Sequence, residues 1–102
     1  MSTTLIEQVL PSESLHRLCR EFHVRELLVF GSALRADFRE ESDLDLLVEF
    51  EPDARVGFLT LSRLQRELSS LAGRRVDLVP KRGLKPAIRA EVLGQARPLY
   101  AA

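Results

Sequence analysis

The sequence predicts a single α/β domain, in which helices pack on a mixed β-sheet. Apolar residues recur at helical spacing in some segments and in short continuous runs in others, in the order helix, strand, strand, helix, strand, helix. Proline and glycine separate these segments, and no linker or repeat divides the chain. A chain of 102 residues can build one hydrophobic core, so residues 1–102 are expected to form one domain.

The first predicted element is an amphipathic helix over residues 12–23. Its apolar residues follow one another at positions i, i+3, i+4 and i+7, and they are Leu15, Leu18, Cys19 and Phe22. Such a stripe must be buried against a sheet. Cys19 is the only cysteine, so it cannot form an internal disulfide, and its place on the stripe predicts a small buried side chain rather than a nucleophile.

Three short apolar runs predict strands. Each is closed by a residue that ends pairing: Gly31 after the first, Pro52 after the second and Pro80 after the third. The predicted strands are residues 26–30, 44–50 and 75–79.

Two further helices complete the prediction. The segment 56–72 carries leucines at helical spacing and is followed by Gly73, the residue type expected just after a helix. Residues 86–94 form a short helix with Pro86 in its first turn, and the tail 97–100 is expected to pack back on the body.

The charges of the chain are balanced in number but segregated along the sequence. The formal net charge is zero, yet residues 1–51 hold eleven Asp and Glu against five Arg, and residues 52–102 hold four against ten Lys and Arg. Two interpretations stay open: a cation site facing a polyanion site, or two solvated surface runs. The start of the chain resembles neither a secretory signal nor a membrane span, so the cytoplasm is the expected location.

Asp43 and Asp45 are the first candidates for chemistry. Side chains at i and i+2 of a strand share one face, so these two carboxylates project together while Leu44 and Leu46 project into the core. Their repulsion costs several kcal/mol at an effective dielectric constant of about 20, and a bound cation removes it. Hard oxygen ligands favour Mg²⁺ or Mn²⁺.

Asp77 is the third candidate, because it stands among apolar residues of the third predicted strand. If that strand lies beside the second, three carboxylates converge, and two magnesium ions held there could clamp a nucleoside triphosphate. The alternative for Asp77 is a salt bridge to Arg74 or Arg75.

Gly31 and Ser32 form the other half of the predicted site. A glycine after a strand lets the backbone approach a ligand closely, and turn N–H groups with a serine hydroxyl suit phosphate oxygens. By itself a Gly-Ser pair is weak evidence, but here it precedes Asp43-Leu44-Asp45 by ten residues.

The run from Phe30 to Val48, FGSALRADFREESDLDLLV, resembles the signature of the polymerase β-like nucleotidyltransferases. It is most similar to the small MNT-domain proteins often encoded beside HEPN-domain toxins. The resemblance implies the polymerase β-like fold. It also implies roles for six residues: Gly31, Ser32 and Arg35 on the triphosphate, and Asp43, Asp45 and Asp77 as catalytic residues and magnesium ligands, with Asp77 as general base. Ala36 departs from the family, in which many members have glycine.

The same resemblance implies an enzyme that uses Mg²⁺ to transfer AMP from ATP to a hydroxyl of a helical HEPN-type toxin, with a tyrosine as the expected acceptor. Such an enzyme would act as an antitoxin in a hetero-oligomer. Because no second domain is predicted to hold the acceptor, the acceptor is expected on another molecule. The alternative is a binding module of the same fold that neutralises the toxin by complex formation alone. Direct nucleic-acid binding by residues 74–89 is not favoured, since this basic stretch contains no aromatic residues for stacking.

Overall fold

The computed structural model describes residues 9–34 and 42–102. Along the chain, helices, strands and two short 3₁₀ turns (η) follow one another in the order predicted, with one strand added at the end. The elements are α2 (Ser12–Glu21), β1 (Val24–Phe30), η1 (Gly31–Leu34), β2 (Leu44–Phe50), α3 (Phe58–Ala72), β3 (Val76–Pro80), η2 (Lys81–Gly83), α4 (Pro86–Gln95) and β4 (Arg97–Ala101).

The strands form one four-stranded sheet in the order β3-β2-β1-β4. The β1 strand runs antiparallel to β2 and to β4, while β2 and β3 are parallel. The crossover between the parallel strands is α3, as a parallel pair requires. The predicted mixed sheet with packed helices is therefore confirmed.

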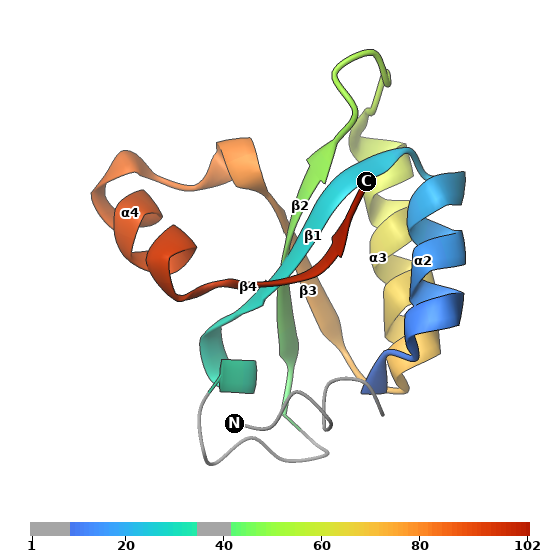
Figure 1. The fold of residues 1–102 in the computed structure, drawn as a ribbon, viewed down its shortest axis with the longest axis horizontal. Coiled ribbons are helices and arrows are strands. Elements are labelled where there is room, and N and C mark those ends of the chain that lie inside the picture. The colour runs from blue at the N-terminus through green and yellow to red at the C-terminus, as the bar shows by residue number, and fades with distance from the viewer. Residues whose placement is uncertain (1–8, 35–41) are drawn as a thin grey trace.

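The main core lies between the sheet and the helices α2 and α3, which stand side by side on one face (Figure 1). The predicted apolar stripe of α2 is buried there through Leu15 and Cys19, and α3 contributes Leu64 and Leu68. Gly73 ends α3 in the left-handed conformation at φ 67°, which confirms its predicted role.

A smaller apolar cluster lies on the opposite face of the sheet, where α4 packs (Figure 1). Its buried members are Leu28, Leu47 and Leu84, and Val92 and Leu93 of α4 pack against them. Each strand of the central pair thus sends alternate residues into two apolar layers. Asp45 lies two residues before Leu47 in β2, so its side chain projects from the face that carries this second cluster.

The tail 97–100, expected only to pack on the body, is a strand. It extends the sheet along β1, and the N–H of Ala102 continues the ladder by donating to the carbonyl of Arg25 at 2.8 Å. Leu99 and Tyr100 pack against the main core. Pro98 hides this strand in the sequence, but proline is tolerated at a sheet edge because an edge strand leaves half of its N–H groups unpaired.

Within residues 9–34 and 42–102, no helix is both long and apolar enough to cross a lipid bilayer.

Candidate active site

Asp45 and Asp77 are register partners in the parallel pair β2–β3. Both are half-buried, and each lies between two residues of the main core: Leu44 and Leu46 for Asp45, Val76 and Leu78 for Asp77. Because side chains alternate along a strand, the two aspartates project from the opposite, α4 side of the sheet. The condition stated for the sequence, that the third strand lies beside the second, is met, and the structure places the two aspartates level with each other.

Asp43 stands two residues before Asp45, at the entrance to β2, and is exposed. The chain is already paired with β3 here, since the N–H of Leu44 donates to the carbonyl of Arg75 at 2.9 Å. Arg74 fixes the same entrance by donating from Nη1 to the carbonyl of Ser42 at 3.2 Å. The start of β2 is therefore held by the segment that leads into β3.

Gly31 lies against the carboxylate of Asp45. It follows β1 at φ 69°, in the left-handed region, and a Cβ atom placed on it would overlap Oδ2 of Asp45. Phe30, the last residue of β1, is the register partner of Asp45, which explains the proximity. Both the backbone angle and the lack of space require glycine at this position.

The position of Asp77 is fixed from α3 as well as from β2. As an edge strand, β3 turns the N–H groups of Val76 and Leu78 away from the sheet, and two side chains of α3 accept them. Ser69 Oγ accepts from Val76 at 3.1 Å, and Gln65 Oε1 accepts from Leu78 at 2.9 Å. The sequence does not reveal the role of these two residues, because a polar residue on a helix gives no sign of pairing with a strand edge.

Asp77 forms an ion pair with Arg75, with 3.4 Å between Oδ1 and Nε. A salt bridge of this kind is the alternative role for Asp77 that the sequence allows. Among the described residues, no three acidic, histidine or cysteine side chains are gathered closely enough to hold a metal ion. The structure thus aligns Asp45 with Asp77 but turns the Asp77 carboxylate to a neighbouring cation.

Part of the predicted triphosphate site lies outside the described residues. Arg35 lies outside them. So does Ala36, the position at which the sequence departs from the family that it resembles. The backbone of Ser32 belongs to η1, which opens at Gly31, but its side chain is not described.

A charged cluster that the sequence did not reveal lies farther along the same face. Glu26 of β1 and Glu49 of β2 are register partners, and Lys81 contacts both. Lys81 Nζ donates to Glu26 Oε1 at 2.9 Å and lies 3.6 Å from Glu49 Oε1. The hydrogen bond to Glu26, aided by the charges of both glutamates and opposed by partial burial, raises the pKa of Lys81.

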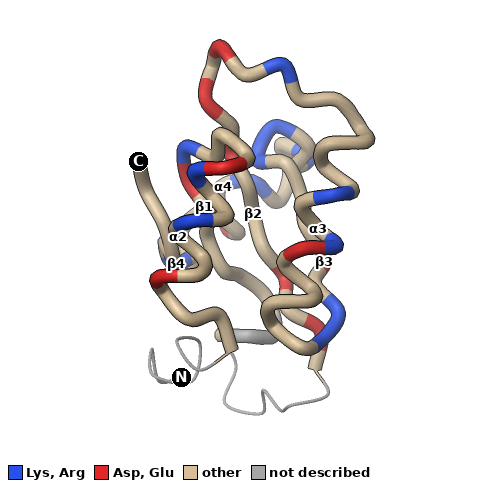
Figure 2. Tube along the Cα trace, turned by 90° about the vertical axis from the view of Figure 1, so that its right-hand side faces the viewer, with Lys and Arg blue, Asp and Glu red and all other residues tan. Residues whose placement is uncertain are grey.

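This cluster also shows how the two halves of the chain combine. Figure 2 shows acidic and basic segments interspersed over the molecule, not separated into two faces. The segregation of charge along the sequence is therefore partly offset in space, since Lys81 of the basic half pairs with Glu26 and Glu49 of the acidic half.

Comparison with known proteins gives a consistent picture. Residues 12–99 match the family described as "Nucleotidyltransferase domain". The protein adenylyltransferase MntA of Thermococcus cleftensis is 39% identical over 95 residues, which cover 91% of this chain and 94% of that protein.

Solved structures share the fold. A structure described as "putative minimal nucleotidyltransferase" is 42% identical, covers 93% of this chain and 92% of its own, and superposes with a TM-score of 0.73. A toxin-antitoxin structure with AMP-PNP, at 23% identity, covers 91% and 75% with a TM-score of 0.71. A tri-AMPylated HEPN toxin of Shewanella oneidensis in complex with MNT antitoxin, at 19% identity, covers 89% and 70% with a TM-score of 0.59. At these lower identities the last two matches concern the fold.

Proposed function

The chain belongs to the nucleotidyltransferase domain family, and from this premise we propose that it transfers AMP from ATP to a hydroxyl group of a HEPN-type partner protein and so acts as an antitoxin. The observation that carries the proposal is the register of Asp45 with Asp77, with Gly31 closing on the Asp45 carboxylate. The 39% identical relative, a protein adenylyltransferase, supports AMP as the transferred group. We propose further that the protein acts as one domain in the cytoplasm, in complex with its partner.

In this proposal Asp43, Asp45 and Asp77 would hold Mg²⁺ once their carboxylates draw closer together than they lie in the structure. Their carboxylates are hard oxygen donors, and Asp45 and Asp77 lie level on neighbouring strands of one face. Magnesium bound there would neutralise charge on the triphosphate and lower the pKa of the attacking hydroxyl. Arg75 competes with the cation for Asp77, since it pairs with Oδ1 and offsets the negative charge of the carboxylate.

The residues of the chain have distinct roles in this proposal. Gly31 lets the backbone of η1 approach the triphosphate, and Ser32 and Arg35 hold phosphate oxygens. Asp77 accepts the proton of the acceptor hydroxyl while the hydroxyl oxygen forms a bond to the α-phosphorus of ATP. The bond from the α-phosphorus to the bridging oxygen breaks, and pyrophosphate leaves. A tyrosine of the partner is the proposed acceptor.

The proposal is tested by incubating the purified protein with ATP, Mg²⁺ and the HEPN-type partner and measuring the mass of the partner. One or more AMP groups should be added, and the doubly substituted Asp43→Asn, Asp45→Asn protein should add none. Failure of the unsubstituted protein to modify a partner that it binds would overturn the enzymatic proposal.

A second function, neutralisation by binding alone, is favoured by one observation: Arg75 already occupies the Asp77 carboxylate. The Asp43→Asn, Asp45→Asn protein separates the two functions. A binding module would still neutralise the toxin after both substitutions, whereas an enzyme would not.

A further inference from the structure

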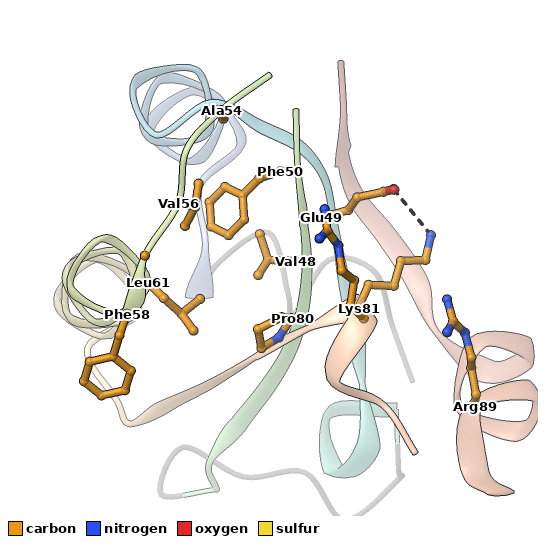
Figure 3. A pocket seen from close by; sticks show the side chains of 12 residues that line it. Val48, Glu49, Phe50, Ala54, Val56, Phe58, Leu61, Pro80, Lys81 and Arg89 are labelled. Carbon is orange, nitrogen blue, oxygen red and sulfur yellow. Dashed lines mark ion pairs between the residues drawn. The ribbon is translucent and has the colours of Figure 1, made fainter. Parts of the chain in front are cut away.

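A groove of about 440 Å³ lies where β2 and β3 end, at the other end of these strands from Asp43 and Asp45. Helix α3 forms one side, and η2 and α4 form the other (Figure 3). None of the six predicted site residues lines it. Glu49, which does, is four residues beyond Asp45, about 13 Å along an extended strand.

The groove has one apolar wall and one basic wall. Phe58 and Leu61 of α3, together with Val56 before it, form the apolar wall. Lys81 and Arg89 extend from the opposite side (Figure 3). The groove therefore presents a bulky apolar surface and positive charge to the same occupant.

The two arginines of the basic wall, Arg82 and Arg89, are available for an external anion. Both are exposed, and neither makes an ion pair within residues 9–34 and 42–102. Lys81 differs, since its charge is compensated by Glu26 and Glu49. The uncompensated charge of the groove is thus positive.

The apolar wall is unusually exposed at its outer end. The exposed fraction is 80% for Phe58 and 78% for its neighbour Leu59. These are the two most exposed large apolar residues among those described. Burying an aromatic side chain against a partner removes apolar surface from water and so stabilises a complex. Large apolar side chains left exposed together at a groove mark a contact surface.

We propose that this groove docks a segment of the partner protein in which a bulky apolar side chain is flanked by carboxylates. The proposal rests on the proposed function, because it assigns a second contact to the same partner. Charge complementarity selects the occupant: Arg82 and Arg89 receive the carboxylates while Phe58 and Leu61 receive the apolar side chain. The groove begins at Val48, about 10 Å along β2 from Asp45, so a nucleotide held in it would have its α-phosphorus away from the carboxylates.

Docking at this distance has a kinetic consequence. It holds the partner on the protein without touching the reacting atoms, so it lowers KM for the partner and leaves kcat unchanged.

The direct test measures binding of a fluorescein-labelled peptide, Glu-Asp-Phe-Leu-Asp-Glu, by fluorescence polarisation without ATP. The unsubstituted protein should bind it, and Phe58→Ser combined with Arg89→Glu should weaken binding at least tenfold. Arg66→Glu on α3 is the matched charge control, since Arg66 is exposed but outside the groove. A peptide with serines in place of Phe and Leu should bind at least tenfold more weakly.

The proposal would be overturned by no binding of the peptide or by equal binding by the doubly substituted protein. Displacement of the peptide by ATP would also overturn it and would assign the groove to the nucleotide. A dimer in light scattering that the same substitutions dissociate, without peptide binding, would also overturn it in favour of a second copy. The peptide-binding assay does not depend on AMP transfer. Repeating it with the Asp43→Asn, Asp45→Asn protein therefore separates loss of docking from loss of the proposed activity.

Discussion

The Asp45 carboxylate lies so close to Gly31 that a Cβ atom at position 31 would overlap Oδ2 and lie 3.3 Å from the carboxyl carbon. The Gly31→Ala substitution must therefore displace either the turn or the carboxylate. We expect the rate of AMP transfer to fall by about a hundredfold or more, because a displacement of about 1 Å in a catalytic group can lower the rate by that factor. The rate of AMP incorporation into the partner measures the effect.

Gly73→Ala is the matched control for backbone strain. Gly73 has nearly the same φ, 67° against 69° for Gly31, but among the described residues no atom beyond its chain neighbours lies within 4 Å of a Cβ placed there. Both substitutions should lower the free energy of unfolding by about 1–2 kcal/mol through the left-handed backbone. Only Gly31→Ala should lose activity, and an equal loss in Gly73→Ala would show that strain alone is responsible.

Replacing Arg75 should strengthen metal binding. The Arg75→Met protein no longer has a cation beside Asp77, so the carboxylate is free to turn to a metal ion. Since Arg75 is 74% exposed, solvent screens the pair, and we expect the dissociation constant for Mn²⁺ to fall only about two- to fivefold. Electron paramagnetic resonance of free Mn²⁺ gives the constant directly. Arg66→Met, which removes an exposed charge from α3, should leave it unchanged, and a weaker affinity in Arg75→Met would contradict the assigned competition.

Lys81 should stabilise the fold up to high pH. Without it, Glu26 and Glu49 face each other as like charges on neighbouring strands, so Lys81→Met should lower the free energy of unfolding by about 1–2 kcal/mol. The folded pKa of Lys81 is raised above the unfolded value of about 10.4. Its contribution is therefore complete below that pH and is lost as the pH rises through the folded pKa. Denaturant unfolding at several pH values should show this loss in the unsubstituted protein and not in Lys81→Met.

The Cys19 thiol should be inert in the folded protein. It is fully buried, and burial raises its pKa to about 12 against a smaller opposing effect of Arg20. A thiol reagent such as dithionitrobenzoate reacts with the thiolate, so labelling at pH 8 should require unfolding. Rapid labelling of the native protein would contradict the burial of Cys19.

The sequence predicted the parts of the fold that depend on periodicity. The stripe of α2, the leucines of α3 and the alternation of Leu44 and Leu46 with the aspartates all report which side of an element is buried, and the structure confirms them. The strand β4 was not predicted because Pro98 disrupts the pattern and its pairing with β1 is non-local.

For the site, the sequence predicted residue types and spacing but not the contacts between distant segments. The overlap of Gly31 with Asp45 follows from the register of β1 with β2, which no local pattern specifies. The pairing of Arg75 with Asp77 was one of two open alternatives, because a carboxylate between a cation and a metal site is suited to both.

Gln65 offers a test of how Asp77 is positioned from α3. Its Oε1 accepts a hydrogen bond from the N–H of Leu78, the residue directly after Asp77. This N–H lies at the outer edge of β3, where no further strand pairs among the described residues. Gln65→Met removes the acceptor and leaves this half-buried N–H without it, so we expect a loss of about 1–2 kcal/mol in the free energy of unfolding. AMP transfer should fall about tenfold in kcat, with KM for ATP little changed, because Asp77 shifts relative to Asp45.

Gln65→Glu is the conservative control, since a carboxylate oxygen can accept the same hydrogen bond. It should restore both stability and kcat to near those of the unsubstituted protein. Stability that recovers without kcat would mean that Gln65 supports the fold alone. Recovery of both, together with a slower hydrogen exchange of the Leu78 amide than in Gln65→Met, would establish that α3 holds β3, and with it Asp77, level with Asp45.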